Sequence, residues 1–151
     1  MTSKDKTEYL DLAVLLGAEE EPSVQILALY IPNKDRTGKS VRRYRHWVKR
    51  GMAVLSVIGG GATAFPPGDG SWLDPAKRKS VRDLRDLADS DLVWEKTTYM
   101  YTYVDTESFL SNAKHLRAFL HDFGRETNQG EVVFEFDENF FRIREYDPPG
   151  D

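Results

Sequence analysis

The sequence contains no cysteine, which excludes disulfide bonds, thiolate-bound zinc, iron–sulfur clusters and cysteine nucleophiles. It also lacks any apolar run near the roughly 18 residues that a membrane-spanning helix needs. The apolar stretch at residues 10–16 contains Asp11 and is soon followed by Glu19–Glu21, whereas a secretory signal carries no acid in its core. We therefore predict a cytoplasmic protein with no membrane partner.

The 151 residues are 40% hydrophobic and 30% charged, a balance typical of one globular domain. We predict an N-terminal helix or arm in residues 1–22, which includes a short amphipathic helix at residues 7–17. A single α+β domain is expected in residues 23–146, followed by a C-terminal tail in residues 147–151.

Hydrophobic patterning predicts the elements of the first half of this domain. Residues 23–31 are apolar on both faces, as in a central strand covered on both sides. A helix capped by Ser40 follows, and Gly51 marks a place where it bends or stops, because glycine in a helix costs about 1 kcal/mol relative to alanine. Residues 62–65 are expected to form a short strand and residues 66–70 a turn. The buried stripe of the helix is Val41, Tyr44, Val48, Met52 and Leu55.

The second half repeats the alternation of strand and helix. Asp74 and Pro75 start a helix whose modest apolar face is Val81, Leu84, Leu87 and Ala88. Residues 92–104 form the longest predicted strand. A second long helix, capped by Asp105 or Thr106, ends at Gly124 as its C′ residue, and strands 131–136 and 140–144 form a hairpin. On the long strand Tyr99, Tyr101 and Tyr103 point to one side, while Trp94, Met100 and Val104 point to the other.

The element order β-α-β-(small α)-β-α-β-β predicts a ferredoxin-like two-layer α+β sandwich, with the C-terminal hairpin adding an edge strand. A three-layer α/β fold is the alternative, and it is disfavoured because so few helices cannot cover both faces of a sheet. The sandwich leaves one sheet face open. Exposed apolar patches larger than a few hundred Å² usually mark a partner or ligand surface. We expect Tyr99, Tyr101 and Tyr103 to form an interface with a second copy or a protein partner, or to bind a flat ligand.

Charge is distributed unevenly along the chain. Residues 34–50 carry a local charge of +7, although the whole chain has a net charge of −4. A basic helix with Tyr44 and Trp47 interleaved predicts contact with nucleic acid or with a phosphate-bearing ligand. Pairing with the acidic ends of the chain, in cis or across an oligomer, is the alternative. The predicted anion-binding residues are Arg36, Lys39, Ser40, Arg42, Arg43, Arg45 and Lys49.

Two glycine-containing segments resemble nucleotide-binding motifs. Residues 33–40 resemble the P-loop pattern, but Asn33 stands where the first glycine is needed. A weaker expectation is an anion near the start of the following helix, with arginines extended into solvent as the alternative. The segment Gly59–Ala64 resembles a dinucleotide fingerprint, but Phe65 and the two prolines after it exclude the helix that this fingerprint requires. We predict a flexible connection between the helix and the following strand there.

No metal site and no cofactor are predicted. His115 and His121 are six residues apart on one helix and project about 240° apart, so they cannot bind one metal ion. The polar turn after this helix gives weak catalytic candidates: Glu126 as a general base, Arg125 as a group that orients an anionic substrate, and His121. Trp72, beside a proline- and glycine-rich turn, either closes a pocket or anchors the turn.

Three functional hypotheses follow. The leading one is a non-catalytic binding protein that self-associates or docks a partner through the open sheet face and contacts an anion through its basic helix. The second is a nucleic-acid-associated protein that uses the basic helix and the tyrosine row. The third is a small enzyme with a pocket near Trp72 and Arg125/Glu126.

Overall fold

The computed structural model describes residues 12–19 and 24–150. Residues 12–16 are helical, and the rest of the helix expected at residues 7–17 lies largely outside the described residues. Leu12, Val14, Leu15 and Leu16 are all exposed. The domain boundaries drawn from the sequence remain a prediction.

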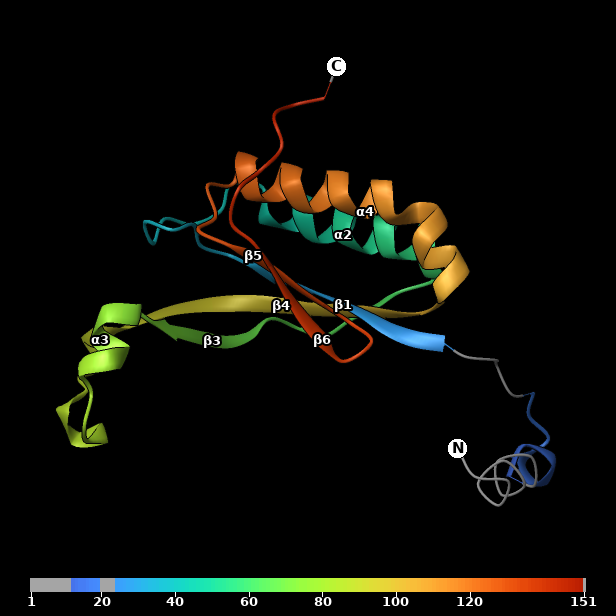
Figure 1. The fold of residues 1–151 in the computed structure, drawn as a ribbon, viewed down its shortest axis with the longest axis horizontal. Helices are drawn as coiled ribbons and strands as arrows, with labels where there is room; N and C mark the ends of the chain where they lie inside the picture. The colour runs from blue at the N-terminus through green and yellow to red at the C-terminus, as the bar shows by residue number, and fades with distance from the viewer. Residues whose placement is uncertain (1–11, 20–23, 151) are drawn as a thin grey trace.

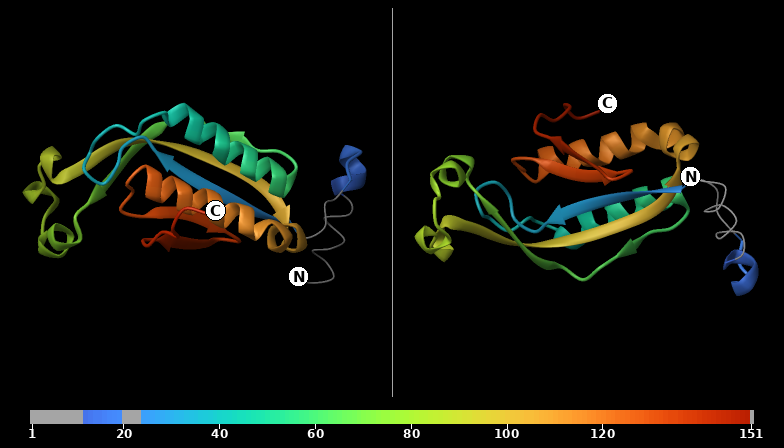
Figure 2. Two further views of the ribbon diagram at one scale, coloured as in Figure 1. Left: turned by 90° about the horizontal axis from the view of Figure 1, so that it is seen from above. Right: turned by 60° about the horizontal axis from the view of Figure 1, so that its bottom comes forward.

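The described residues form one antiparallel sheet with helices on one side (Figure 1). The strand order is β2-β4-β1-β5-β6, and β3 also pairs with β4. Helices α2 (Tyr44–Gly59) and α4 (Thr106–Glu126) pack side by side on the same face, as the view from above shows (Figure 2). The predicted two-layer sandwich is confirmed, and β6 is the edge strand added by the hairpin. The strands are β1 (Val24–Pro32), β2 (Thr63–Ala64), β3 (Gly68–Leu73), β4 (Leu92–Asp105), β5 (Val132–Phe136) and β6 (Asn139–Ile143).

The register of β1 against β4 separates a core face from an open face. Alternate residues of these strands point under the helices and are fully buried, because successive side chains of a strand point to opposite faces. The residues between them point away from the helices, so that Tyr30 lies opposite Tyr99 and Ile26 lies opposite Tyr103. The tyrosine row is therefore on the side that α2 and α4 leave uncovered. The buried strand residues of the core face are Leu27, Leu29, Ile31, Met100 and Val104.

The β3–β4 ribbon extends beyond the rest of the sheet, because β1 pairs with β4 only as far as Thr97 (Figure 1). The sequence predicts a turn at residues 66–70, whereas β3 already begins at Gly68. The following helix α3 (Pro75–Ser80) is also shorter than its apolar pattern suggests, and two 3₁₀ turns come after it. Leu84 is 81% exposed, since this end of the ribbon has no second layer to bury an apolar face.

Helix α2 differs from the sequence prediction at its start and at Gly51. It begins at Tyr44 rather than after Ser40, with Arg43 as an N-cap in the left-handed region (φ 56°) and no side-chain cap. Gly51 neither bends nor ends the helix. A Cβ atom at Gly51 would lie 2.8 Å from Met100 Sδ, so this glycine lets the helix sit close to the sheet.

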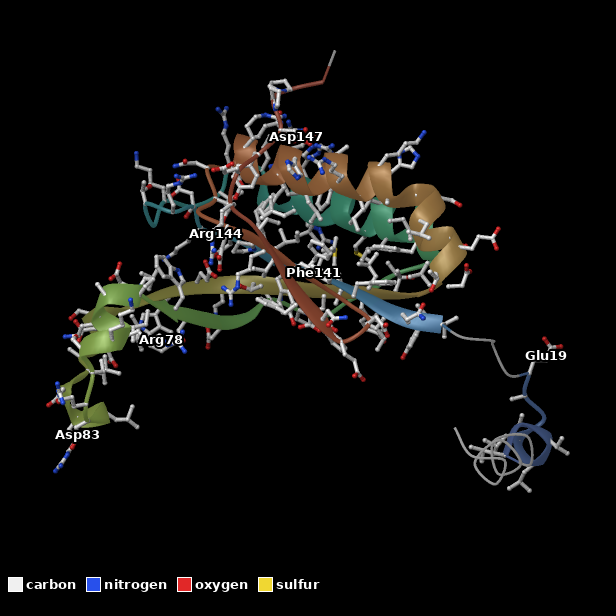
Figure 3. The ribbon with its side chains drawn as sticks, viewed as in Figure 1. Glu19, Arg78, Asp83, Phe141, Arg144 and Asp147 are labelled. Atoms are coloured by element: carbon white, nitrogen blue, oxygen red, sulfur yellow. The ribbon has the colours of Figure 1, made fainter. Side chains whose placement is uncertain are left out.

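Helix α4 continues through Gly124 to Glu126, so the prediction that Gly124 ends the helix is wrong. Gly124 is buried, and the ring of Tyr146 fills the space that a side chain there would take. The residues after β6 therefore fold back over α4. We call Tyr146 and Asp147 the C-terminal strap; Figure 3 labels Asp147 above the helix.

Candidate functional site

The open sheet face contains a hollow of about 710 Å³, which we call the open-face hollow. It lies across the end of β1, where Tyr30 and Pro32 line it together with Thr97 of β4 and Val133 of β5. Trp72 and Pro75 line it from the β3–β4 ribbon, and Phe140 lines it from β6. This volume falls in the range of about 300–1,000 Å³ that is usual for small-molecule sites. The remaining lining residues are Lys34, Asp35, Arg36, Glu95, Gln129, Gly130, Glu131, Arg142 and Arg144.

Two carboxylates that line this hollow have shifted pKa values: hydrogen bonds from Thr37 lower that of Asp35, whereas that of Glu95 is raised. Burial raises its pKa above the ordinary value, while a hydrogen bond from the Thr97 side chain and the charge of Lys34 act in the opposite direction. Perturbed acids in hollows are typical of functional sites.

Tyr30 lies on the floor beside a second carboxylate. Its hydroxyl donates a hydrogen bond to Glu135 of β5, and its ring meets Tyr99 edge-on with centroids 5.2 Å apart. Burial, followed by the interaction with Glu135, raises the pKa of Tyr30. Because the Tyr30 hydroxyl donates its hydrogen bond to Glu135, its oxygen can only accept a hydrogen bond from a ligand.

Positive groups line the opposite side. Arg142 and Arg144 both donate to Glu131, at 3.1 and 3.3 Å, so this cluster carries a net positive charge. Figure 3 labels Arg144, which comes directly after β6. Lys34 makes no ion pair with a carboxylate among the described residues. The hollow therefore combines aromatic rings with ionisable groups of both signs.

Gln129 joins the loops that form one end of the hollow. Its buried side chain donates to the Lys34 carbonyl at 3.1 Å. The backbone carbonyl of Gln129 accepts hydrogen bonds from Arg36 Nη2 and from the Tyr146 hydroxyl, both at 2.9 Å. The sequence marks residues 125–130 only as a polar turn, and nothing in it reveals that Gln129 connects three distant segments.

The tyrosine row does lie on the open face, but its members differ in accessibility. Tyr99 and Tyr101 are half-buried, and Phe65 stacks on both, with centroids 5.8 and 6.0 Å apart. Tyr103 is 54% exposed. Their role as an interface remains a prediction.

The basic segment is exposed at Arg42, Arg43, Arg45 and Lys49. The two aromatic residues expected to interleave with it are not available for stacking. Trp47 is buried against Phe119 and Phe123 of α4. The Tyr44 hydroxyl is bonded to the Ile31 carbonyl and to Thr98.

The loop at residues 33–40 is closed by its own carboxylate. Asp35 accepts from the backbone amides of Thr37 and Lys39, at 2.8 and 3.0 Å, and Ser40 pairs with Lys34 across the loop. The amides that a P-loop would present to a phosphate are therefore already used. Arg36 is also engaged, since it donates to the carbonyl of Gln129.

The weak catalytic candidates are not brought together with Trp72. Arg125 pairs with Asp122 and donates to the Asp147 carbonyl, and it does not line the open-face hollow. His121 is buried and accepts from the Asp147 amide through Nδ1 at 2.7 Å, which is a structural bond of the C-terminal strap. Glu126 is exposed at the end of α4.

Within residues 12–19 and 24–150, no group of three His, Asp or Glu side chains is arranged to hold a metal ion. None of the helices in this part of the chain combines the length and apolar character required to span a bilayer.

Comparison with known proteins gives a fold relationship. No protein-family profile matches the sequence, and no curated protein sequence matches it. Among solved structures, the chain resembles a phage SAM lyase in complex with S-methyl-5'-thioadenosine. The TM-score is 0.56 at 13% sequence identity, and the match covers 84% of this chain and 95% of the other. At this identity the likeness shows a shared α+β fold.

Proposed function

We propose that the open-face hollow is a small-molecule active site and that the protein is a lyase acting on a sulfonium nucleoside of the S-adenosylmethionine class. The observation that carries this proposal is Glu95, a half-buried carboxylate with a raised pKa in a ligand-sized hollow lined by Trp72 and Tyr30. The likeness to the phage SAM lyase supports the choice of substrate class.

The chemistry of the lining suits such a ligand. Trp72, Tyr30 and Phe140 offer aromatic surface to a purine ring or a sulfonium cation, which interacts favourably with aromatic faces. Lys34 suits the carboxylate of an amino-acid chain. The acceptors Glu95 and the Tyr30 oxygen suit its ammonium group.

Breaking a carbon–sulfur bond of a sulfonium leaves the electron pair on sulfur, so the leaving group is a neutral thioether. The site needs no metal for this step, because the positive charge on sulfur already activates the bond. We assign to Glu95 the role of general base in an elimination: its carboxylate accepts a proton from the carbon next to the one bonded to sulfur, the C–H electron pair forms a carbon–carbon double bond in the four-carbon fragment, and the carbon–sulfur pair leaves with the thioether. Burial raises the pKa of Glu95, which makes its carboxylate a stronger base.

The test is to incubate the protein with S-adenosylmethionine and follow S-methyl-5'-thioadenosine by chromatography. We expect product release by the wild type and loss of at least tenfold in rate in Glu95→Gln, within the range for removing a general acid or base. Glu138→Gln, the same change on the exposed β5–β6 turn, is the matched control and should leave the rate unchanged. Absence of product, together with no thermal stabilisation by either compound, would overturn the proposal.

A second candidate function, self-association, is favoured by the other end of the open face. Val24, Ile26 and Tyr103 lie together where β1 begins and β4 ends, and they are 40–54% exposed. We propose that a second copy of the chain covers them, because burial of such apolar groups is favourable by about 25 cal/mol per Å². Sedimentation of the wild type should then give more than the 17.3 kDa of one chain, and Tyr103→Lys should shift it toward the monomer. A wild-type monomer at high concentration contradicts this candidate.

A further inference from the structure

Cations that lack an acidic partner are concentrated just before α2 and along its first two turns. Six other arginines are paired with carboxylates, among them Arg50, Arg117 and Arg125 with Asp122 or Asp147, whereas Arg36, Arg78 and Arg82 form no ion pair within the described residues. The basic patch, which we define as Arg42, Arg43, Arg45 and Lys49, forms no ion pair within residues 12–19 and 24–150. The first turn of α2 holds no acidic residue, so the positive end of the helix dipole adds to the positive electrostatic potential of these side chains.

The basic patch adjoins a groove along the β2 edge of the sheet, which we call the edge groove. It has a volume of about 480 Å³ and runs between α2 and the connection from β2 to β3. Arg45 and Met52 line it from the helix, and Phe65, Pro66 and Pro67 line it from the connection. Figure 2 shows this connection passing beside α2 and β4.

Phe65 links the edge groove to the open face. Its ring is 51% exposed and stacks on Tyr99 and Tyr101, with interplanar angles of 27° and 23°. An aromatic platform therefore continues around the sheet edge from a cationic helix. Proteins that bind single-stranded nucleic acid without sequence preference combine these two features, cations for the backbone and rings on which bases stack.

We propose that the basic patch and Phe65 together bind single-stranded nucleic acid, with phosphates on the patch and a base stacked on Phe65. This surface is separate from the open-face hollow and is independent of its proposed activity. An acidic protein segment would satisfy the cations but would leave the stacked aromatic platform without a partner, so the geometry favours a polyanion that carries bases.

The experiment is fluorescence anisotropy of a labelled oligothymidylate with the full chain at several salt concentrations. Four phosphate contacts predict a slope of about −3 in a plot of log affinity against log salt, or about a 50-fold loss between 50 and 200 mM. Arg45→Ala combined with Lys49→Ala should halve this slope. The matched control, Arg78→Ala combined with Lys79→Ala on α3, removes the same charge from exposed cations outside the surface and should leave the slope unchanged.

A separate variant tests the stacking of a base on Phe65. Phe65→Leu keeps an apolar cover over the tyrosines but removes the ring, and we expect affinity to fall about tenfold with an unchanged salt slope. Melting curves establish that each variant is folded. The proposal is overturned by absence of a saturable signal at about 100 µM protein, the weak end of non-specific binding. It is equally overturned by an equal effect of the α3 control pair, or by binding to anionic phosphatidylserine vesicles without binding to the oligonucleotide.

Discussion

Replacing Gly124 by alanine tests whether the C-terminal strap is a packed part of the fold. Gly124 is inside α4, where alanine would be favoured by about 1 kcal/mol on helix propensity alone. A methyl group at this position, however, would lie within the ring of Tyr146, so that ring must leave its place. The substitution therefore sets a local gain in helix propensity against the loss of a tertiary contact.

The loss outweighs the gain. A half-buried tyrosine hides about 100 Å² of apolar surface, which is worth about 2.5 kcal/mol at 25 cal/mol per Å². The hydrogen bond from its hydroxyl to the Gln129 carbonyl adds about 1 kcal/mol. After the gain in propensity is subtracted, Gly124→Ala is expected to lower the free energy of unfolding by about 2.5 kcal/mol.

Urea denaturation followed by tryptophan fluorescence measures this difference. The decisive comparison is the same substitution in a Tyr146→Ala background, where the clash is absent and Gly124→Ala should stabilise the protein by about 1 kcal/mol. Tyr146→Phe is the control that keeps the ring and loses only the hydroxyl bond. Equal destabilisation of both backgrounds by Gly124→Ala would show that the ring of Tyr146 is not what opposes the substitution.

Three further predictions address other parts of the fold. Gly51→Ala places a methyl group 2.8 Å from Met100 Sδ and should destabilise the protein by about 1–3 kcal/mol in urea unfolding, the usual cost of overpacking a core. The helix-capping bonds of Asp105 lower its pKa, so its contribution to stability is present above the unfolded value of 3.8 and is lost as the pH falls through the lower folded value. Melting temperatures of Asp105→Asn between pH 5 and 2 should accordingly fall less steeply than those of the wild type. Tyr30→Phe leaves Glu135 without its donor and should cost about 1–2 kcal/mol in urea unfolding; a loss below about 0.5 kcal/mol contradicts the paired geometry. Burial raises the pKa of several tyrosines, Tyr30 among them, so an ultraviolet titration should show one fewer late-ionising tyrosine in this variant than in the wild type.

Local patterns predict those parts of the fold that depend on short-range physics. Alternation along residues 92–104 correctly separates Tyr101 from Met100, because the twofold period of a strand holds wherever the strand is paired. The stripe on α2 correctly identifies Val48 and Leu55 as core residues. The open face could also be predicted, because the sequence contains too few helices to cover both faces of the sheet.

The errors occur where a distant residue determines the local structure. Gly124 and Gly51 read as helix ends or bends on propensity, but Tyr146 and Met100 occupy the space that their missing side chains leave. Trp47 lies between basic residues in the sequence and is nevertheless buried against α4, because a helix turns it about 100° from each neighbour.

The candidate site could be predicted only in part. The sequence leaves open whether Trp72 closes a pocket or anchors a turn, and in the structure it lines the open-face hollow without Arg125 or Glu126. The sequence does not point to Glu95. Glu95 sits in a strand of alternating residues and gives no local signal. Its perturbed pKa arises only once the β3–β4 ribbon and the loop that carries Lys34 surround it.

The hydrogen bonds of Gln129 have a consequence for the order in which the protein folds. Gln129 is 95 positions from Lys34 along the chain, and it also accepts from Arg36 and Tyr146. The corner that holds Lys34 against the hollow is therefore expected to close late, because bringing such distant positions together first costs chain entropy. The helices and hairpins would form before the ligand cavity is complete.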